Sequence, residues 1–383
     1  MDPQPILLRP SWFDGRIASR RPRAARWGAA ERPAVLRGAI VADERPVAAK
    51  RYTAGVLSGA ELLQDRWGQL LPPDDPLWAW PVFAAAERAR NRPDHHGYAA
   101  VRRQGDVIAV LPMSGFRGLR LPSVLGAGDG GLPGRVDRVL PPMSVLLCGN
   151  PLGRGRVLSA GPLLEPVADR LVREVLAHAR LREFDVVVFK DFAEPDLAPL
   201  RRSLLRSRFF FAPAPPDLEL RLGRFHPPRL PAPPGTRVEV LDDFQRLLPQ
   251  VADLHRAAAG VVDVLDEEFL RVLRPVDGLR RKLIACFRDD RLVAYLLCLF
   301  AGSGATAVQV ALDERVVEEA GLRGLAAELA AAEGCERIRF PRAAARDAAR
   351  TGGELVEQSF AITHLKPLPR AVLRGLLPGV LSR

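Results

Sequence analysis

The chain has 383 residues, 48% hydrophobic and 26% charged, values typical of a globular protein with room for two domain cores. Its formal net charge of +11 comes mostly from arginine, because only Lys50, Lys190, Lys282 and Lys366 are lysines. The arginines are spread along the whole chain with few aromatic residues among them, which argues against a dedicated nucleic-acid-binding domain and leaves either an Arg-rich solvated surface or attraction to anionic partners.

The cysteines indicate a reducing compartment. Cys148, Cys286, Cys298 and Cys335 form no C-x-x-C pair, and three of them lie in or beside apolar runs. This pattern predicts buried free thiols, a cytoplasmic location and no metal site. No stretch of about 18 apolar residues occurs, so we expect no membrane span.

The N-terminal part of the chain predicts an extension followed by a first α/β unit. Residues 1–60 are rich in Arg, Pro and Ala without sustained periodicity, and we expect a basic, poorly ordered extension. A first domain is expected over residues 61–225. Its predicted elements are a helix at 77–90, a hairpin at 98–113, a strand at 144–148, an amphipathic helix at 163–181, a buried strand at 184–189, a helix at 196–208 and a strand from 209.

A Pro-rich linker and a second unit follow. Residues 226–236 hold five prolines and predict a stiff, extended connection. A second domain is expected over residues 237–383. Its predicted elements are helices at 242–259 and 266–273, a hairpin at 282–300, a strand at 305–312, a helix at 315–333, a strand at 338–340, a helix at 342–350 and a strand at 355–365.

The two units share a short repeat. Ala100–Leu111 and Ala285–Leu296 are both two apolar runs joined by a polar turn, and four positions carry the same residue in both copies. A strand, an amphipathic helix and another strand follow each copy. The repeat predicts a duplicated domain built on mixed sheets covered by helices.

This order of elements resembles the GNAT acyltransferase fold, and the tandem arrangement resembles the FemAB-like branch, in which two GNAT-like domains share one chain. Besides the duplicated hairpin, two segments carry the resemblance. Phe184–Phe192, followed by a helix and Phe209–Phe211, is similar to the end of a GNAT unit. Leu325–Phe340 is similar to the family's helix that ends at Gly before a strand. The resemblance covers roughly residues 60–370.

The resemblance implies an N-acyltransferase that moves an acyl group from acyl-CoA or a carrier-protein thioester to an amine of a small metabolite or amino acid bound between the halves. It implies no permanently bound cofactor. Two alternatives stay open, namely amide-bond formation from aminoacyl-tRNA, for which the basic charge would suit tRNA, and a GNAT-like binding module without catalysis. The sequence does not indicate an oligomeric state.

Two segments are candidates for binding the acyl donor. Asn150, Gly153, Arg154 and Gly155 have the spacing of the GNAT phosphate loop, with Asn where the family has Gln or Arg, and backbone N–H groups of such a loop can cradle phosphate. A Gly-rich surface turn is the alternative. In the second half the matching loop is acidic, and Arg323 with Gly324 is the nearest candidate.

Four residues are candidates for the chemistry. Lys190 and Asp191 follow a buried strand, at the carboxyl edge where sites of α/β sheets collect, although a strand-end ion pair is the structural alternative. Tyr295, within the second hairpin, can donate to a leaving thiolate, or it is a core tyrosine. His364, at the last strand, is a candidate base.

Overall fold

The computed structural model describes residues 52–70, 74–89, 93–121, 141–224, 235–258, 266–273, 278–313, 316–317, 319–342, 348 and 351–381. Residues 1–51 of the expected extension and residues 226–234 of the expected linker lie outside this part of the chain. Among the described residues, regular structure is present already at Tyr52, before the expected boundary at residue 60, because residues 52–57 pair with a neighbouring strand.

The predicted elements that lie in the described residues occur in the predicted order, whereas most of the helix expected at 342–350 lies outside them. The elements at Tyr52–Leu57, Gln64–Leu70, Leu158–Ser159, Arg237–Leu241 and Pro367–Leu381 were not predicted. The strands are β1 (Tyr52–Leu57), β2 (His95–Arg103), β3 (Asp106–Leu119), β4 (Met143–Cys148), β5 (Leu158–Ser159), β6 (Val186–Ala193), β7 (Phe210–Arg221), β8 (Arg237–Leu241), β9 (Arg280–Arg288), β10 (Arg291–Ala301), β11 (Gly304–Leu312), β12 (Arg337–Phe340) and β13 (Glu354–His364). The helices and 3₁₀ turns are η2 (Ala60–Leu63), α2 (Gln64–Leu70), η3 (Pro76–Trp78), α3 (Trp80–Arg88), α6 (Glu165–Leu181), α7 (Glu194–Arg206), η4 (Leu222–Arg224), η5 (Gln245–Leu247), α8 (Leu248–Ala258), α9 (Glu267–Val272), α10 (Glu319–Ala332) and α12 (Pro367–Leu381).

Within the described residues all the strands join one mixed sheet, whose order reads symmetrically from both edges. The order is β1-β2-β3-β4-β6-β13-β7-β12-β11-β10-β9-β8, with β5 beside β3. The repeated hairpins form β2–β3 and β9–β10, and the parallel pairs β4–β6 and β11–β12 occupy matching places. The duplication predicted from the repeat is therefore visible in the sheet.

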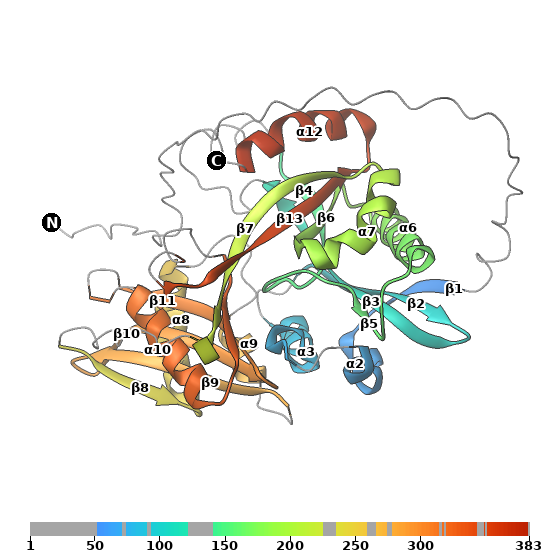
Figure 1. Cartoon of the computed structure of the whole chain (residues 1–383). Helices are drawn as coiled ribbons and strands as arrows, with labels where there is room; N and C mark the ends of the chain where they lie inside the picture. The colour runs from blue at the N-terminus through green and yellow to red at the C-terminus, as the bar shows by residue number, and fades with distance from the viewer. Residues whose placement is uncertain are drawn as a thin grey trace, which may run out of the picture.

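The two halves exchange their last strands at the centre of this sheet. β13, from the second half, lies between β6 and β7 of the first half, and β7 pairs with β12 of the second half. Figure 1 shows β7 and β13 as two long strands that cross the middle of the molecule. The expected division at residues 225 and 237 thus separates two stretches of sequence that do not each complete their own sheet.

Helices cover both faces of the sheet because each carries an apolar stripe. The stripe predicted over 163–181 forms α6, which packs with α7 on the strands of the first half (Figure 1), and α10 covers β9–β12 in the second half. A further apolar cluster joins the halves, since Trp78 and Phe83 of the first half pack with Phe269 and Tyr295 of the second. The seam between the copies is consequently a packed interface.

The sequence also predicted buried free cysteines, no membrane-spanning helix and no metal site. All four cysteines are buried and unpaired, as predicted. Among the described residues, no helix is long and apolar enough to cross a bilayer, and no group of three or more potential metal-ligating side chains is suitably arranged.

Candidate functional site: a charged pocket at the seam

The inner strand of the second half, β12, has one apolar and one charged face. Because successive side chains of a strand point to opposite faces, Ile338 and Phe340 enter the apolar cluster under α10, whereas Arg337 and Arg339 face the other way. Arg339 is 8% exposed, so its guanidinium is held inside the protein.

The exchanged strands extend the charged face of β12. Glu219 and Arg221 of β7 lie opposite Arg339 and Arg337, respectively, in the antiparallel register. Glu354 of β13 is in turn paired with Glu219 in the sheet and forms an ion pair with Arg221 at 3.7 Å. Both partners of that ion pair are mostly exposed, so the outer end of the charged face is open to solvent.

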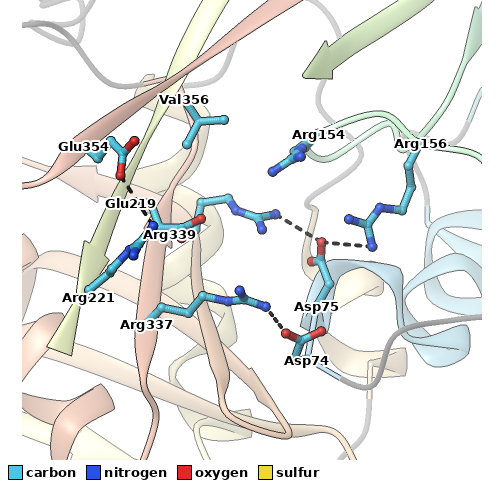
Figure 2. Close-up of a pocket in the computed structure, with 10 residues that line it drawn as sticks. All are labelled: Asp74, Asp75, Arg154, Arg156, Glu219, Arg221, Arg337, Arg339, Glu354 and Val356. Carbon is cyan, nitrogen blue, oxygen red and sulfur yellow. Dashed lines mark hydrogen bonds and ion pairs between the residues drawn. The ribbon is translucent and has the colours of Figure 1, made fainter. Parts of the chain in front are cut away.

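Segments of the first half form the opposite wall and close a pocket of about 320 Å³ (Figure 2). Asp74 and Asp75 immediately precede η3, and Arg154 and Arg156 lie in the loop that follows β4. The lining residues are Asp74, Asp75, Arg154, Arg156, Glu219, Arg221, Arg337, Arg339, Glu354 and Val356. The pocket therefore lies at the seam between the two copies, with residues of both halves in its walls.

Ion pairs cross the pocket from one half to the other. Asp75 accepts a hydrogen bond of 3.1 Å from Arg339 and lies 4.0 Å from Arg156, while Asp74 pairs with Arg337 (Figure 2). Burial lowers the pKa of the Arg339 guanidinium, but the carboxylates of Asp75 and Asp217 more than offset this, so its pKa lies above the usual value. Arg339 consequently stays charged.

Behind this pocket, a bulge of β6 turns Lys190 and Asp191 toward each other. Phe189 and Phe192 pair with β13 residues only two positions apart, so β6 carries one extra residue here, and Asp191 has a positive φ of 57°. The Lys190 ammonium contacts the Asp191 carboxylate, although neighbouring side chains of a regular strand point apart. Both residues are buried.

This bulge is connected to the end of β12 through buried charges. The Arg342 guanidinium lies 3.5 Å from the Asp191 carboxylate, and the Arg342 backbone N–H donates to Asp217 of β7 at 3.1 Å. Burial lowers the pKa of Lys190, opposed by Asp191, and burial raises the pKa of Asp217, opposed by Arg339. The carboxyl ends of β6 and β12, equivalent strands of the two halves, thus meet in one ionic cluster.

The predicted phosphate-loop segment packs between η3 and this bulge. The Asn150 side-chain amide donates to the Leu77 carbonyl at 2.7 Å, and the Gly155 N–H donates to the Asp191 carbonyl at 2.8 Å. A Cβ at Gly153 would lie 2.6 Å from the Leu77 side chain, and one at Gly155 would lie 2.2 Å from the Lys190 carbonyl oxygen. These three residues therefore pack inward, and the following helix begins only at Glu165.

Arg154 differs from its neighbours in the loop because its side chain lines the pocket. Its guanidinium forms two hydrogen bonds with Asp196 in the first turn of α7, at 2.7 and 3.1 Å. The structure thus brings Arg154 and Gly155 together with Lys190 and Asp191, which the sequence predicted as two separate candidate sites.

The other predicted chemical residues lie elsewhere. Tyr295 is fully buried in the apolar cluster that joins the halves. His364 is paired with Val186 at the start of β6, about 13 Å along the strand from Lys190, and its Nδ1 accepts a hydrogen bond from the Lys366 N–H at 3.0 Å. Burial lowers the pKa of His364. Neither residue lines the charged pocket.

The predicted donor-binding pair of the second half is on α10. Arg323 is buried, forms an ion pair with Glu319 at 2.6 Å and lies over the Phe340 ring at 5.7 Å. Gly324 follows it on the same helix. Because Phe340 is on the apolar face of β12, this pair is on the side of the sheet opposite the pocket.

Sequence reasoning missed most of the pocket's lining. The alternation of Arg337 and Arg339 with apolar residues could have indicated this site, because buried charges on one face of a strand require oppositely charged groups nearby. The adjacent acids Asp74 and Asp75 carried no comparable pattern, because their role depends on the packing of η3 against the second half.

Comparisons with solved structures agree with this architecture. A tandem GNAT protein from the clavulanic acid biosynthesis pathway matches with a TM-score of 0.54 at 14% identity, covering 82% of this chain and 99% of the other. FemX matches with a TM-score of 0.50 at 12% identity, covering 80% and 96%. The C-terminal domain of a protein provisionally assigned as a lysylphosphatidylglycerol synthetase from Agrobacterium fabrum matches with a TM-score of 0.51 at 10% identity, covering 84% and 96%.

The sheet order, the exchanged strands and these similarities define a protein of the tandem GNAT fold. No family model and no curated protein sequence matches the chain. The fold is therefore shown.

Proposed function

We propose that this protein is an N-acyltransferase that moves an acyl group from acyl-CoA or a carrier-protein thioester to an amine of a small metabolite or amino acid. The observation that carries this proposal is the bulge at Asp191, where a buried carboxylate lies at the carboxyl ends of the parallel strands β4 and β6 and directly behind the seam pocket. Four buried free thiols support action in the cytoplasm.

Asp191 is suited to handle the proton of an attacking amine. Lys190 and Arg342 contact its Oδ2 atom, whereas its buried Oδ1 atom has no hydrogen-bond partner among the described residues. One carboxylate oxygen is thus held in place by cations and the other remains an acceptor. Such a carboxylate can accept a hydrogen bond from an amine and then its proton.

The proposed transfer needs no covalent enzyme intermediate. The neutral amine attacks the thioester carbonyl, the C–N bond forms, the C–S bond breaks and the thiolate leaves. The surplus proton on nitrogen passes to Asp191 and from there to the thiolate. Arg154, at the rim of the pocket and paired with Asp196, is the proposed contact for a single phosphate of a donor that stays outside the pocket interior, since Asn150, Gly153 and Gly155 pack inward.

The proposal is tested with single-turnover transfer to a panel of amines from a set of acyl-CoA thioesters, read by mass spectrometry. Asp191→Asn keeps the side-chain shape and should lower the transfer rate at least about 100-fold, the scale of general-base catalysis. Asp106→Asn, at an exposed carboxylate of β3, is the matched control and should leave the rate unchanged. Equal rates in D191N and wild type, with an unchanged thermal unfolding midpoint, would remove Asp191 from the chemistry.

Aminoacyl-tRNA is the second candidate donor, supported by the net charge of +11 and by the exposed guanidinium of Arg202 on α7. If tRNA binds through phosphate contacts, its affinity should fall steeply between 50 and 200 mM salt, by tenfold or more. Salt-independent or undetectable binding of bulk tRNA excludes this donor.

The inward packing of the loop residues favours a third candidate, a GNAT-like binding module without acyl transfer. Calorimetry with acyl-CoA distinguishes the proposed acyltransferase from this module, because the acyltransferase binds the thioester and the module does not.

A further inference from the structure

The charged pocket contains buried polar atoms that the protein does not satisfy. Asp75 Oδ1, Arg156 Nε and Arg339 Nε are buried and have no hydrogen-bond partner among the described residues. The side-chain carboxylate of Glu219, half-buried on β7, forms no hydrogen bond or ion pair in the same part of the chain, although its charge acts on Arg339. Buried polar groups are nearly always paired, so atoms of this kind mark a place for water or a ligand.

The groups that face the pocket are of two opposite types. The buried Asp75 Oδ1 and the half-buried Glu219 carboxylate offer negatively charged acceptors, whereas Arg339 Nε and Arg156 Nε, the latter 3.8 Å from Asp196, offer positively charged donors, and all four residues line the same pocket. A purely anionic ligand would compete with Asp75 for Arg339 and leave Asp75 Oδ1 and the Glu219 carboxylate without a new cation, at a cost in desolvation and repulsion. A purely cationic ligand would do the reverse. A ligand that carries both charges satisfies both sets.

The overall charge of the pocket also favours a ligand that carries both a positive and a negative charge. Five arginines and four carboxylates line it, and Asp196 lies behind Arg154 and Arg156. This near balance provides no strong positive potential for a polyanion such as a pyrophosphate. The volume of about 320 Å³ is at the small end of ligand pockets, which suits a compact metabolite.

We infer that the seam pocket recognises an acceptor of the α-amino-acid class, with its ammonium group held by Asp75 and Glu219 and its carboxylate held by Arg156 and Arg339. This inference rests on the proposed function only in treating the bound molecule as the acceptor, whose ammonium group is recognised by Asp75 and Glu219 on entry and must lose a proton and move toward Asp191 before it attacks. The charge-assisted hydrogen bonds at both ends make recognition depend on the two groups together. An amine that lacks the carboxylate loses one set, and an N-acylated amino acid loses the other.

The test is a binding experiment on the full chain without any acyl donor. The twenty common free L-amino acids are screened by thermal shift, and the best binder is compared by calorimetry with its decarboxylated amine and its N-acetyl derivative. We expect both derivatives to bind at least tenfold more weakly than the amino acid. Absence of binding by every amino acid, or equal binding of the decarboxylated amine, overturns the inference.

Charge-neutralising variants add a test whose sign distinguishes a zwitterion site from a polyanion site. Asp75→Asn and Glu219→Gln should each weaken amino-acid binding about tenfold. Glu219 forms no ion pair in the described part of the chain, so E219Q should fold normally even if the loss of buried Asp75 unfolds D75N. Glu328→Gln, at a half-buried glutamate of α10 on the opposite face of the sheet, is the control and should change nothing.

Inorganic pyrophosphate is the competing probe. If the pocket is a phosphate site, E219Q removes a repelling charge and should bind pyrophosphate more tightly than wild type, while amino acids fail to bind, and that pair of results refutes the inference. The outcome is separable from that of the proposed function. Amino-acid binding without transfer from any donor contradicts the acyltransferase proposal alone, whereas transfer to amines without a carboxylate contradicts this inference alone.

Discussion

A pair of histidines in the first half should make the stability of the protein fall sharply in mild acid. The Nε2 atoms of His95 on β2 and His178 on α6 lie 2.7 Å apart, with stacked rings. One nitrogen must donate and the other accept, so the hydrogen bond survives one added proton and is broken when both rings are charged. Burial, His178 and the guanidinium groups of Arg182 and Arg117 lower the pKa of His95 to about 4.

The lowered pKa of His95 sets the direction and the magnitude of the change in unfolding free energy with pH. Between pH 6.5 and about 4 the unfolded chain binds a proton that folded His95 does not, so the stabilisation is complete above pH 6.5 and is lost as the pH falls toward 4. The full shift corresponds to roughly 3 kcal/mol. Because His95 is partly exposed and solvent screens its neighbours, we expect about 1–2 kcal/mol. Burial also lowers the pKa of His178, which adds to the effect in the same direction.

Urea unfolding followed by Trp fluorescence at several pH values between 7.5 and 4.5 measures this loss. His95→Gln keeps a hydrogen-bonding group but does not titrate, so its free energy of unfolding should fall by about 1–2 kcal/mol less than that of wild type over this range. Parallel pH profiles for wild type and H95Q would refute the reasoning.

Two further predictions concern backbone packing at the seam. Gly155→Ala places a methyl group 2.2 Å from the Lys190 carbonyl oxygen and 2.4 Å from the Phe192 ring, and should lower the free energy of unfolding by about 1–3 kcal/mol. The control Gly161→Ala, in open space, should change the free energy of unfolding little. Equal urea midpoints for the two variants would show that the loop does not pack on β6 as described. A fragment of residues 52–224 should lack a stable fold, because β6 and β7 lose the strand β13 that lies between them. Adding a separate fragment of residues 235–383 should restore dispersed amide NMR signals. A well-dispersed spectrum from the first fragment alone contradicts this prediction.

Local patterns account for the parts of the fold that the sequence predicted. The repeat placed both hairpins, the apolar stripe of residues 163–181 matched α6, and the continuous apolar run at 184–189 matched the first half of β6. Each of these signals is contained within a few residues of sequence. The exchange of β7 and β13 depends on which distant strands pair with each other. Hydrophobic periodicity within one strand does not specify its pairing partner.

The same contrast between local patterns and long-range pairing explains which site residues the sequence could predict. Lys190 and Asp191 were identified by their position at the end of a buried strand, which is a local property. The bulge that turns them together depends on pairing with β13, and the approach of Asp75 to Arg339 depends on how η3 docks on the second half. These geometric facts arise from tertiary structure and leave no sequence pattern of their own.

The exchanged strands impose an order on biosynthesis. β6 ends at Ala193 and β7 at Arg221, but β13, which lies between them, begins at Glu354 near the end of the chain. At about 5–20 residues per second, a ribosome needs on the order of ten seconds to supply it. During that interval the nascent first half exposes two open strand edges to other polypeptides. Chaperone contact while translation proceeds is the expected consequence, and the pocket can assemble only after β13 has been made.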